Sequence, residues 1–260
     1  MTAPIERLLA IMTRLRDPQC GCDWDLAQDF TSIAPYTIEE AYEVADAIER
    51  NDMAALKGEL GDLLLQVVFH ARMAEEAGLF DFNAVATAIS DKMEARHPHI
   101  FDAAQTGTGV PSGNWEALKA AERDANGATS ALDGVASALP ALMRAEKLQK
   151  RAARHGFDWP DTNGPAEKLH EEMIELAEAN TDAERAEEAG DLLFAAVNLV
   201  RAHGIPPEDA LRAANLKFER RFRAMEAMAA QQGELFAALD LDAQEALWLA
   251  VKASEIAEPA

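Results

Sequence analysis

The chain has 260 residues, 49% of them hydrophobic and 27% charged, so it can bury a core and does not have the composition of a disordered protein. Its formal net charge of −22 argues against a general nucleic-acid binder, because such proteins need an excess of Lys and Arg to neutralise phosphates. No apolar run is long enough to span a membrane, the N-terminus lacks a secretory pattern, and the closely spaced Cys20 and Cys22 suit neither a zinc knuckle nor a disulfide framework. We therefore expect a cytoplasmic protein with no nucleic-acid partner and no membrane partner.

Helical periodicity dominates the first half, and the alternating patterns typical of strands are scarce, so we expect an all-α fold. After an irregular segment over 16–36, Thr37 followed by Glu40 fits a capping box and predicts that a helix begins there. Three glycines and a proline predict a loop over 106–114. The expected helices span 5–15, 37–50, 53–77, 82–96 and 115–123.

The segment 125–134 is small, polar and glycine-containing, which is typical of a linker. It predicts two domains, residues 1–127 and 128–260. After the linker the layout of the first half repeats, with an irregular segment following the first helix. The expected helices of the second half span 139–154, 166–180, 183–202, 207–232 and 242–253.

One acidic pattern occurs in both halves. The segment EEAYE begins at Glu39 and ELGD begins at Glu59, while EEMIE begins at Glu171 and EAGD begins at Glu188. Other segments repeat in the same order, such as GCDW at 21–24 with GFDW at 156–159, and KMEAR at 92–96 with KFERR at 217–221. Several matches in one order indicate duplication of a helical unit.

The acidic pattern predicts a metal site in each half. Side chains three residues apart share a helix face, and a short connection makes consecutive helices antiparallel neighbours, so the acids of each half are expected to converge. Carboxylates next to apolar helix surface are costly unless they bind a cation, although a solvated acidic face is the alternative. Oxygen-only ligands suit Mg²⁺ or Mn²⁺, which would bridge to a phosphate-bearing substrate. The converging acids are Glu40, Glu43, Glu59 and Asp62 in the first half, and Glu172, Glu175, Glu188 and Asp191 in the second.

Basic and aromatic residues downstream are candidates for binding such a substrate. Lys217, Arg220 and Arg221 share a helix face that could hold phosphate oxygens, with ion pairing to nearby glutamates as the alternative. Trp248 could stack on a base or pack in the core. Lys168, just before Glu171, is a further phosphate candidate.

A di-iron carboxylate bundle is a third possibility, because that fold uses pairs of Glu and His three residues apart. Glu94 with His97, and Glu167 with His170, have this spacing. Neither pair lies within the repeated acidic pattern, so the sequence disfavours an iron site.

The combination of EExxE, ExxD, KFERR and a later tryptophan resembles the MazG nucleoside triphosphate pyrophosphohydrolases in their two-domain bacterial form. The resemblance covers nearly the whole chain and includes IAPYT at 33–37, RHPH at 96–99 and LPAL at 139–142. It implies two tandem all-α helical-bundle domains, a homodimer and dependence on Mg²⁺. The implied activity converts NTPs or dNTPs to the monophosphate and pyrophosphate, in nucleotide-pool house-cleaning or a stress-related role.

The resemblance also implies roles for individual residues. Catalytic and metal-binding roles fall on Glu172, Glu175, Glu188 and Asp191, with metal-binding counterparts at Glu40, Glu43, Glu59 and Asp62. Substrate contacts fall on Lys168, Glu171, Lys217, Arg220, Arg221 and Trp248. We expect catalysis in the second half, because Ala95 stands where the second copy has Arg220. The alternative is that the first half is a non-catalytic module for nucleotide binding or dimerisation.

Overall fold

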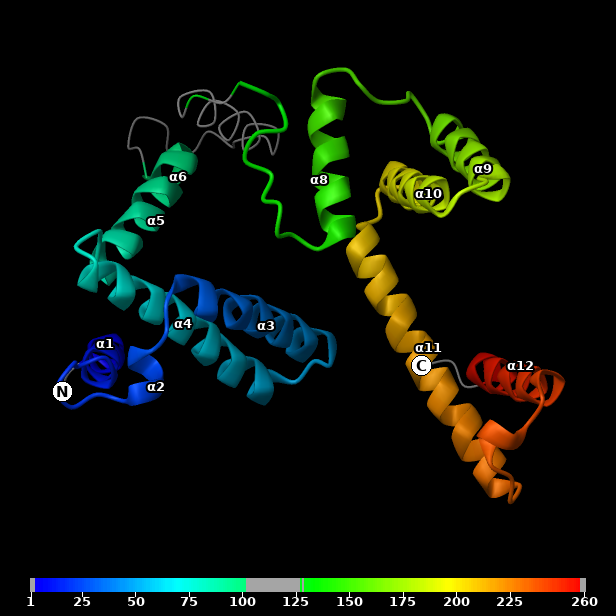
Figure 1. Ribbon diagram of the computed structural model, residues 1–260, viewed down its shortest axis with the longest axis horizontal. Helices are drawn as coiled ribbons and strands as arrows, with labels where there is room; N and C mark the ends of the chain where they lie inside the picture. The colour runs from blue at the N-terminus through cyan, green and yellow to red at the C-terminus, as the bar shows by residue number, and fades with distance from the viewer. Residues whose placement is uncertain (1–2, 102–126, 128, 258–260) are drawn as a thin grey trace. The chain divides into compact units, whose positions relative to one another are not determined.

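The computed structural model describes residues 3–101, 127 and 129–257. Every regular element within these residues is helical, so the predicted all-α fold is confirmed (Figure 1). None of the helices in these ranges is long and apolar enough to cross a membrane. The chain divides into two compact units, Met1–Leu118 and Lys119–Ala260, and each is described by itself. The domain boundary at 127/128 stays a prediction, and the expected loop over 106–114 and helix over 115–123 lie outside the described residues.

The first unit is built on an antiparallel helix pair, α3 and α4, against which α1 packs through α4 (Figure 1). The turn between α3 and α4 contains Asn51, whose φ of 54° is the left-handed conformation that Asn tolerates better than most residues. The helices of this unit are α1 Pro4–Leu15, α2 Asp23–Leu26, α3 Phe30–Glu49, α4 Met53–Glu76, α5 Phe82–Arg96 and α6 Pro98–Phe101.

An apolar core fills the space between α1, α3 and α4. It consists of Met12, Ile33, Val68, Phe69 and Met73. The buried Arg16 closes one side of this core, with its guanidinium carbon 5.4 Å from the centroid of the Phe69 ring. Arg16 Nη2 also donates to Glu76 Oε2 at 2.8 Å, so the charge that lies on the core is paired.

Helix α3 begins earlier than the sequence predicts, at Phe30 and not at Thr37. The Asp29 carboxylate accepts the Ser32 N–H at 2.8 Å, and Ser32 Oγ accepts the Asp29 N–H at 2.9 Å. This reciprocal cap satisfies the first donors of the helix, which therefore begins before Pro35 and includes it. Thr37 has a different partner, because its Oγ1 lies 3.1 Å from His70 Nε2 on α4.

The cap at Asp29 gives a stability prediction. The substitution Asp29→Ala removes the acceptor for the Ser32 N–H and is expected to lower the free energy of unfolding by about 1 kcal/mol. Urea unfolding followed by circular dichroism measures this loss. Asp29→Asn keeps an acceptor oxygen and should cost much less, so equal losses in the two variants would contradict the capping role.

The second unit repeats the arrangement, with α9 and α10 as the antiparallel pair and α8 packed on α10 (Figure 1). Helix α11 contacts α8 and α10, and α12 packs on α11. The expected helices are confirmed within a few residues, except that α9 begins at Asn163, before the predicted 166, and α12 reaches Ala257, beyond the predicted 253. The elements are α8 Ala141–Arg154, α9 Asn163–Glu178, α10 Asp182–Ala202, α11 Pro207–Gln231, η1 Phe236–Ala238 and α12 Leu241–Ala257.

The two units differ in where their apolar cores lie. The buried apolar cluster of the second unit joins α11 to α12 and consists of Met225, Ala229, Leu247 and Val251. Helices α8 to α10, which correspond to α1, α3 and α4, bury the apolar Pro165, Ala195 and Val197 together with several polar side chains: Glu146, Gln149, Glu172 and Asn198. Buried polar groups are thus more frequent in this region of the second unit than in the corresponding region of the first.

Candidate functional site

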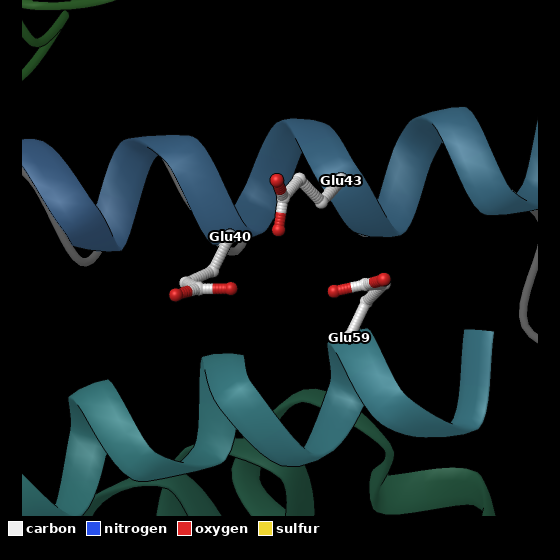
Figure 2. Close-up of side chains that lie close together, drawn as sticks. All are labelled: Glu40, Glu43 and Glu59. Atoms are coloured by element: carbon white, nitrogen blue, oxygen red, sulfur yellow. The ribbon is translucent and has the colours of Figure 1, made fainter. Parts of the chain in front are cut away.

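Three of the four acids predicted to converge in the first unit do so, namely Glu40, Glu43 and Glu59. Glu40 and Glu43 project from α3 toward Glu59 on α4, and each offers an oxygen within 4.8 Å of the others (Figure 2). Partial burial raises the pKa of the Glu59 carboxyl, and the charges of Glu43 and Asp62 raise it further. Burial likewise raises the pKa of Glu40, followed by the charge of Asp62. Asp62 therefore lies within electrostatic reach of the trio, although it is not part of it.

A second trio of acids lies in the second unit, and it takes partly different positions of the repeated pattern. Glu172 on α9 and Glu188 and Asp191 on α10 each offer an oxygen within 4.8 Å of the others. Partial burial raises the pKa of Glu188, and the charge of Glu175 is the next cause. Glu175 is thus a near neighbour of this trio, as Asp62 is of the first.

Glu172 shows that the second trio fits a divalent cation. Its side chain is only 4% exposed, and its Oε2 has no hydrogen-bond partner among the described residues. Its Oε1 lies 2.7 Å from Lys168 Nζ, which also donates to Glu171 Oε1 at 2.8 Å. Hydrogen bonds to Glu171 and Glu172 hold the pKa of the Lys168 ammonium above its usual value. A buried carboxylate oxygen without a donor, beside two further carboxylates, is suited to a hard cation such as Mg²⁺ or Mn²⁺.

The iron alternative has no support in the described residues. Glu94, Glu167 and His170 are exposed, and none of them belongs to either carboxylate trio. His97 Nδ1 lies 2.7 Å from the Met93 carbonyl oxygen, within its own helix turn. The Glu–His spacings are therefore features of helix surfaces and helix ends.

A pocket of about 750 Å³ opens beside the second trio. Glu172 and Asp191 form part of its wall, and Phe157 and Trp159 supply exposed aromatic surface. Its other polar lining residues are Gln149, Asp158, Lys168, Asn198 and Arg201. In the sequence, residues 156–159 are recognisable only as a repeated segment, and their spacing does not predict the pocket. Comparing the two copies position by position along α4 and α10 would have shown a polar residue, Asn198, where the first copy is apolar.

The predicted phosphate-binding and base-binding residues lie elsewhere in the second unit. Arg220 and Arg221 both pair with Glu255 on α12, at 2.8 and 2.6 Å. Arg221 also lies over the Trp248 ring, 5.3 Å from its centroid. Lys217 is exposed on α11. These residues line the α11–α12 pair and do not line the pocket, whereas Lys168 does. Their substrate roles stay predictions.

The position of the Trp159 ring depends on Gly164, at the start of α9. A Cβ atom at Gly164 would lie 2.0 Å from Trp159 Cδ1, a distance at which the ring must shift. Gly164→Ala is therefore expected to displace Trp159, change its fluorescence and lower the free energy of unfolding by about 1–3 kcal/mol.

Gly190 provides the matched control for this substitution. It lies inside α10, and a Cβ atom there meets nothing within 4 Å. Gly190→Ala should therefore stabilise the protein by about 0.5–1 kcal/mol, as alanine does in an open helical position. Thermal melts of both variants test the prediction, and a tolerated alanine at 164 with an unchanged tryptophan spectrum would contradict it.

The sequence also matches two family models and several known enzymes. The model of the MazG nucleotide pyrophosphohydrolase domain matches residues 28–101, and the phosphoribosyl-ATP pyrophosphohydrolase model matches residues 139–217. The chain is 52% identical over 258 residues to the nucleoside triphosphate pyrophosphohydrolase of Escherichia coli, covering 97% of this chain and 98% of that protein. It is 40% identical over 250 residues to the nucleoside triphosphate pyrophosphohydrolase/pyrophosphatase MazG of Thermotoga maritima, covering 96% of each. It is 34% identical over 187 residues to the nucleoside triphosphate pyrophosphohydrolase of Mycolicibacterium smegmatis, covering 70% of this chain and 55% of that protein.

The family predicted from the sequence is thereby confirmed. Two acidic helix pairs in tandem, and 52% and 40% identity over nearly the full length of two named pyrophosphohydrolases, lead to the same assignment. The chain belongs to the MazG family of nucleotide pyrophosphohydrolases.

Proposed function

We propose that this chain hydrolyses nucleoside triphosphates to the monophosphate and pyrophosphate at a divalent-cation site in its second unit. The observation that carries the proposal is the buried Glu172 Oε2, which has no donor among the described residues and lies beside Glu188 and Asp191. Its relatives in Escherichia coli and Thermotoga maritima are named nucleoside triphosphate pyrophosphohydrolases. We further propose that it acts in the cytoplasm, where it would remove excess or non-standard nucleotides.

The residues of the second trio would hold Mg²⁺, with Mn²⁺ as a substitute, because all the ligand atoms are carboxylate oxygens. A cation bound there would neutralise polyphosphate charge and polarise the phosphorus that is attacked. The Lys168 ammonium lies 2.7 Å from Glu172 Oε1, and it could bind a phosphate oxygen once that oxygen replaces a carboxylate partner. Glu175, outside the close trio, remains available to accept a proton from the attacking water.

The proposal includes a homodimer, because one chain does not bring all predicted substrate contacts together. Lys217, Arg220, Arg221 and Trp248 lie on α11 and α12, away from the pocket lining. Large apolar side chains are also exposed on α9 and α10 near the acids: Met173, Ile174, Leu193 and Phe194. A second copy docked on this face would cover the apolar surface and supply the missing basic residues.

Product analysis tests the proposed reaction. With a deoxynucleoside triphosphate and Mg²⁺, we expect the monophosphate and pyrophosphate in equal amounts, resolved by ion-exchange chromatography. EDTA should abolish the reaction, and added Mg²⁺ or Mn²⁺ should restore it, since the carboxylates alone repel the polyphosphate. Release of the diphosphate and inorganic phosphate, or undiminished activity in EDTA, would rule the proposal out.

A further inference from the structure

The two units place different residues at one equivalent position. Helices α4 and α10 align through their ExxD pairs, and the same register sets Phe69 of the first unit against Asn198 of the second. Phe69 is 4% exposed and packs in the apolar core. Asn198 is 9% exposed and lines the pocket. A buried aromatic ring therefore stands in the first unit at the position that borders the pocket in the second.

The orientation of the Asn198 amide is fixed by its neighbours. Its Oδ1 accepts hydrogen bonds from Nε of Arg201, at 3.1 Å, and from Nη2 of the same side chain. Because a guanidinium group only donates, the amide oxygen must face it, and the two amide N–H donors must point away. Arg201 is itself held by the Asp158 carboxylate, through contacts of 2.7 and 3.1 Å. Asn198 thus offers a preset donor group at the pocket wall.

A second buried amide in the pocket lining has an unused acceptor. Gln149 is 6% exposed, and its Nε2 donates to the Phe194 carbonyl at 2.9 Å. Its Oε1 has no partner among the described residues. Exposed rings of Phe157 and Trp159 lie in the same lining. Flat apolar walls with a fixed donor and an unsatisfied acceptor suit a planar ring with polar edges.

We propose that this pocket is the subsite for the nucleobase of the substrate, and that Asn198 donates a hydrogen bond to an acceptor on the base. The inference rests on the proposed function, which puts the polyphosphate at Glu172 and Asp191. Both acids belong to the pocket wall, so a nucleotide bound there extends its base into the same hollow. The volume of about 750 Å³ lies within the usual range for ligand pockets, roughly 300–1,000 Å³.

Trp248 is the competing base-binding residue. The centroid of its ring lies 5.9 Å from that of Phe218, at a tilt of 45°, and the Arg221 guanidinium lies over the ring, so both neighbours compete with a base for the Trp248 ring. The pocket beside Asn198 has room for a base without displacing any such contact. The two sites predict different effects of substitution, and binding measurements separate them.

Calorimetric titration of the full-length protein with the 5′-monophosphates of the four common deoxynucleosides, without metal, tests the subsite. Asn198→Asp keeps the side-chain shape and the contact with Arg201 but removes the donors, and it should weaken the best-bound monophosphate roughly 10–100-fold. Asn198→Phe copies the first unit and should weaken binding at least as much. Asn215→Asp on the exposed face of α11 is the matched control and should bind as the wild type does. Circular dichroism melts confirm that each variant is folded.

Kinetics with the triphosphate give the second measurement. Asn198→Asp should raise KM roughly 10–100-fold and leave kcat little changed, because the lost contact is to the base and not to the reacting phosphates. The subsite would be overturned if both Asn198 variants kept the wild-type affinity and KM. It would also be overturned if only Trp248→Ala lost binding, or if the wild-type protein bound no monophosphate. If the Asn198 variants lose affinity but no triphosphate is hydrolysed, the subsite stands and the proposed reaction fails. If hydrolysis is found and the Asn198 variants behave as the wild type, only the subsite fails.

Discussion

Replacing Glu172 by Gln or Asp191 by Asn is expected to lower the rate of pyrophosphate release by roughly 10³-fold, the largest loss we predict for any substitution in the chain. Both carboxylates belong to the second trio and to the pocket wall. Each amide keeps the side-chain volume but removes a negative charge from the cation site. Steady-state release of pyrophosphate at saturating Mg²⁺ measures the effect.

The first unit supplies the control for these variants. Glu40→Gln and Asp62→Asn change the same chemistry at the positions of the repeat that correspond to Glu172 and Asp191, and Phe69 fills the equivalent of the nucleotide pocket there. We expect these variants to retain most of the activity. A comparable loss in the first-unit variants, or an active Glu172→Gln, would show that the second unit is not the catalytic one.

A folding defect would not account for the predicted loss. The acids of the second trio repel one another, and this repulsion adds to partial burial in raising the pKa of Glu188. A group with a raised folded-state pKa destabilises the native protein once the pH exceeds that pKa, so removing one charge should stabilise the metal-free protein at neutral pH. Melting temperatures equal to or above that of the wild type are therefore expected for Asp191→Asn, which removes one of the repelling charges near Glu188.

Phe69→Ala is expected to lower the free energy of unfolding of the first unit by about 3–5 kcal/mol. The ring is buried among Met12, Ile33 and Val68, and Arg16 lies against its face, so truncation leaves a cavity and removes the surface on which a buried cation rests. Urea unfolding followed by circular dichroism measures the change. Phe80→Ala removes a ring that is about half exposed and serves as the control, with an expected cost below about 1 kcal/mol. Similar costs at the two positions would contradict the central role of Phe69.

Helix positions and the approach of the acids in each unit were predictable because both depend on local spacing, whereas the sequence did not predict which three of the four acids come within 4.8 Å in each unit. Acids three residues apart share a helix face whatever the tertiary structure, and the short α3–α4 and α9–α10 turns force the pairs together. The start of α3 was not predicted correctly, since two caps compete over 29–40 and the choice depends on His70, which lies one helix away and engages Thr37. The pocket was also missed, because it depends on how the 156–159 turn packs against α8 and α10. Nothing in local spacing reveals that Arg201 and Asp158 meet.

The repeated helices of the two units differ in packing at the position of Phe69 and Asn198, and this difference should affect their dynamics. Where Phe69 locks α1, α3 and α4 together, the matching helices α8 to α10 enclose open space bordered by Asn198 and Gln149. Fewer packed atoms mean weaker van der Waals attraction between these helices. The backbone amides of α8 to α10 should therefore exchange with deuterium faster than those of α1, α3 and α4. A bound nucleotide would fill the pocket and contact its walls, so it should slow the hydrogen exchange of these amides.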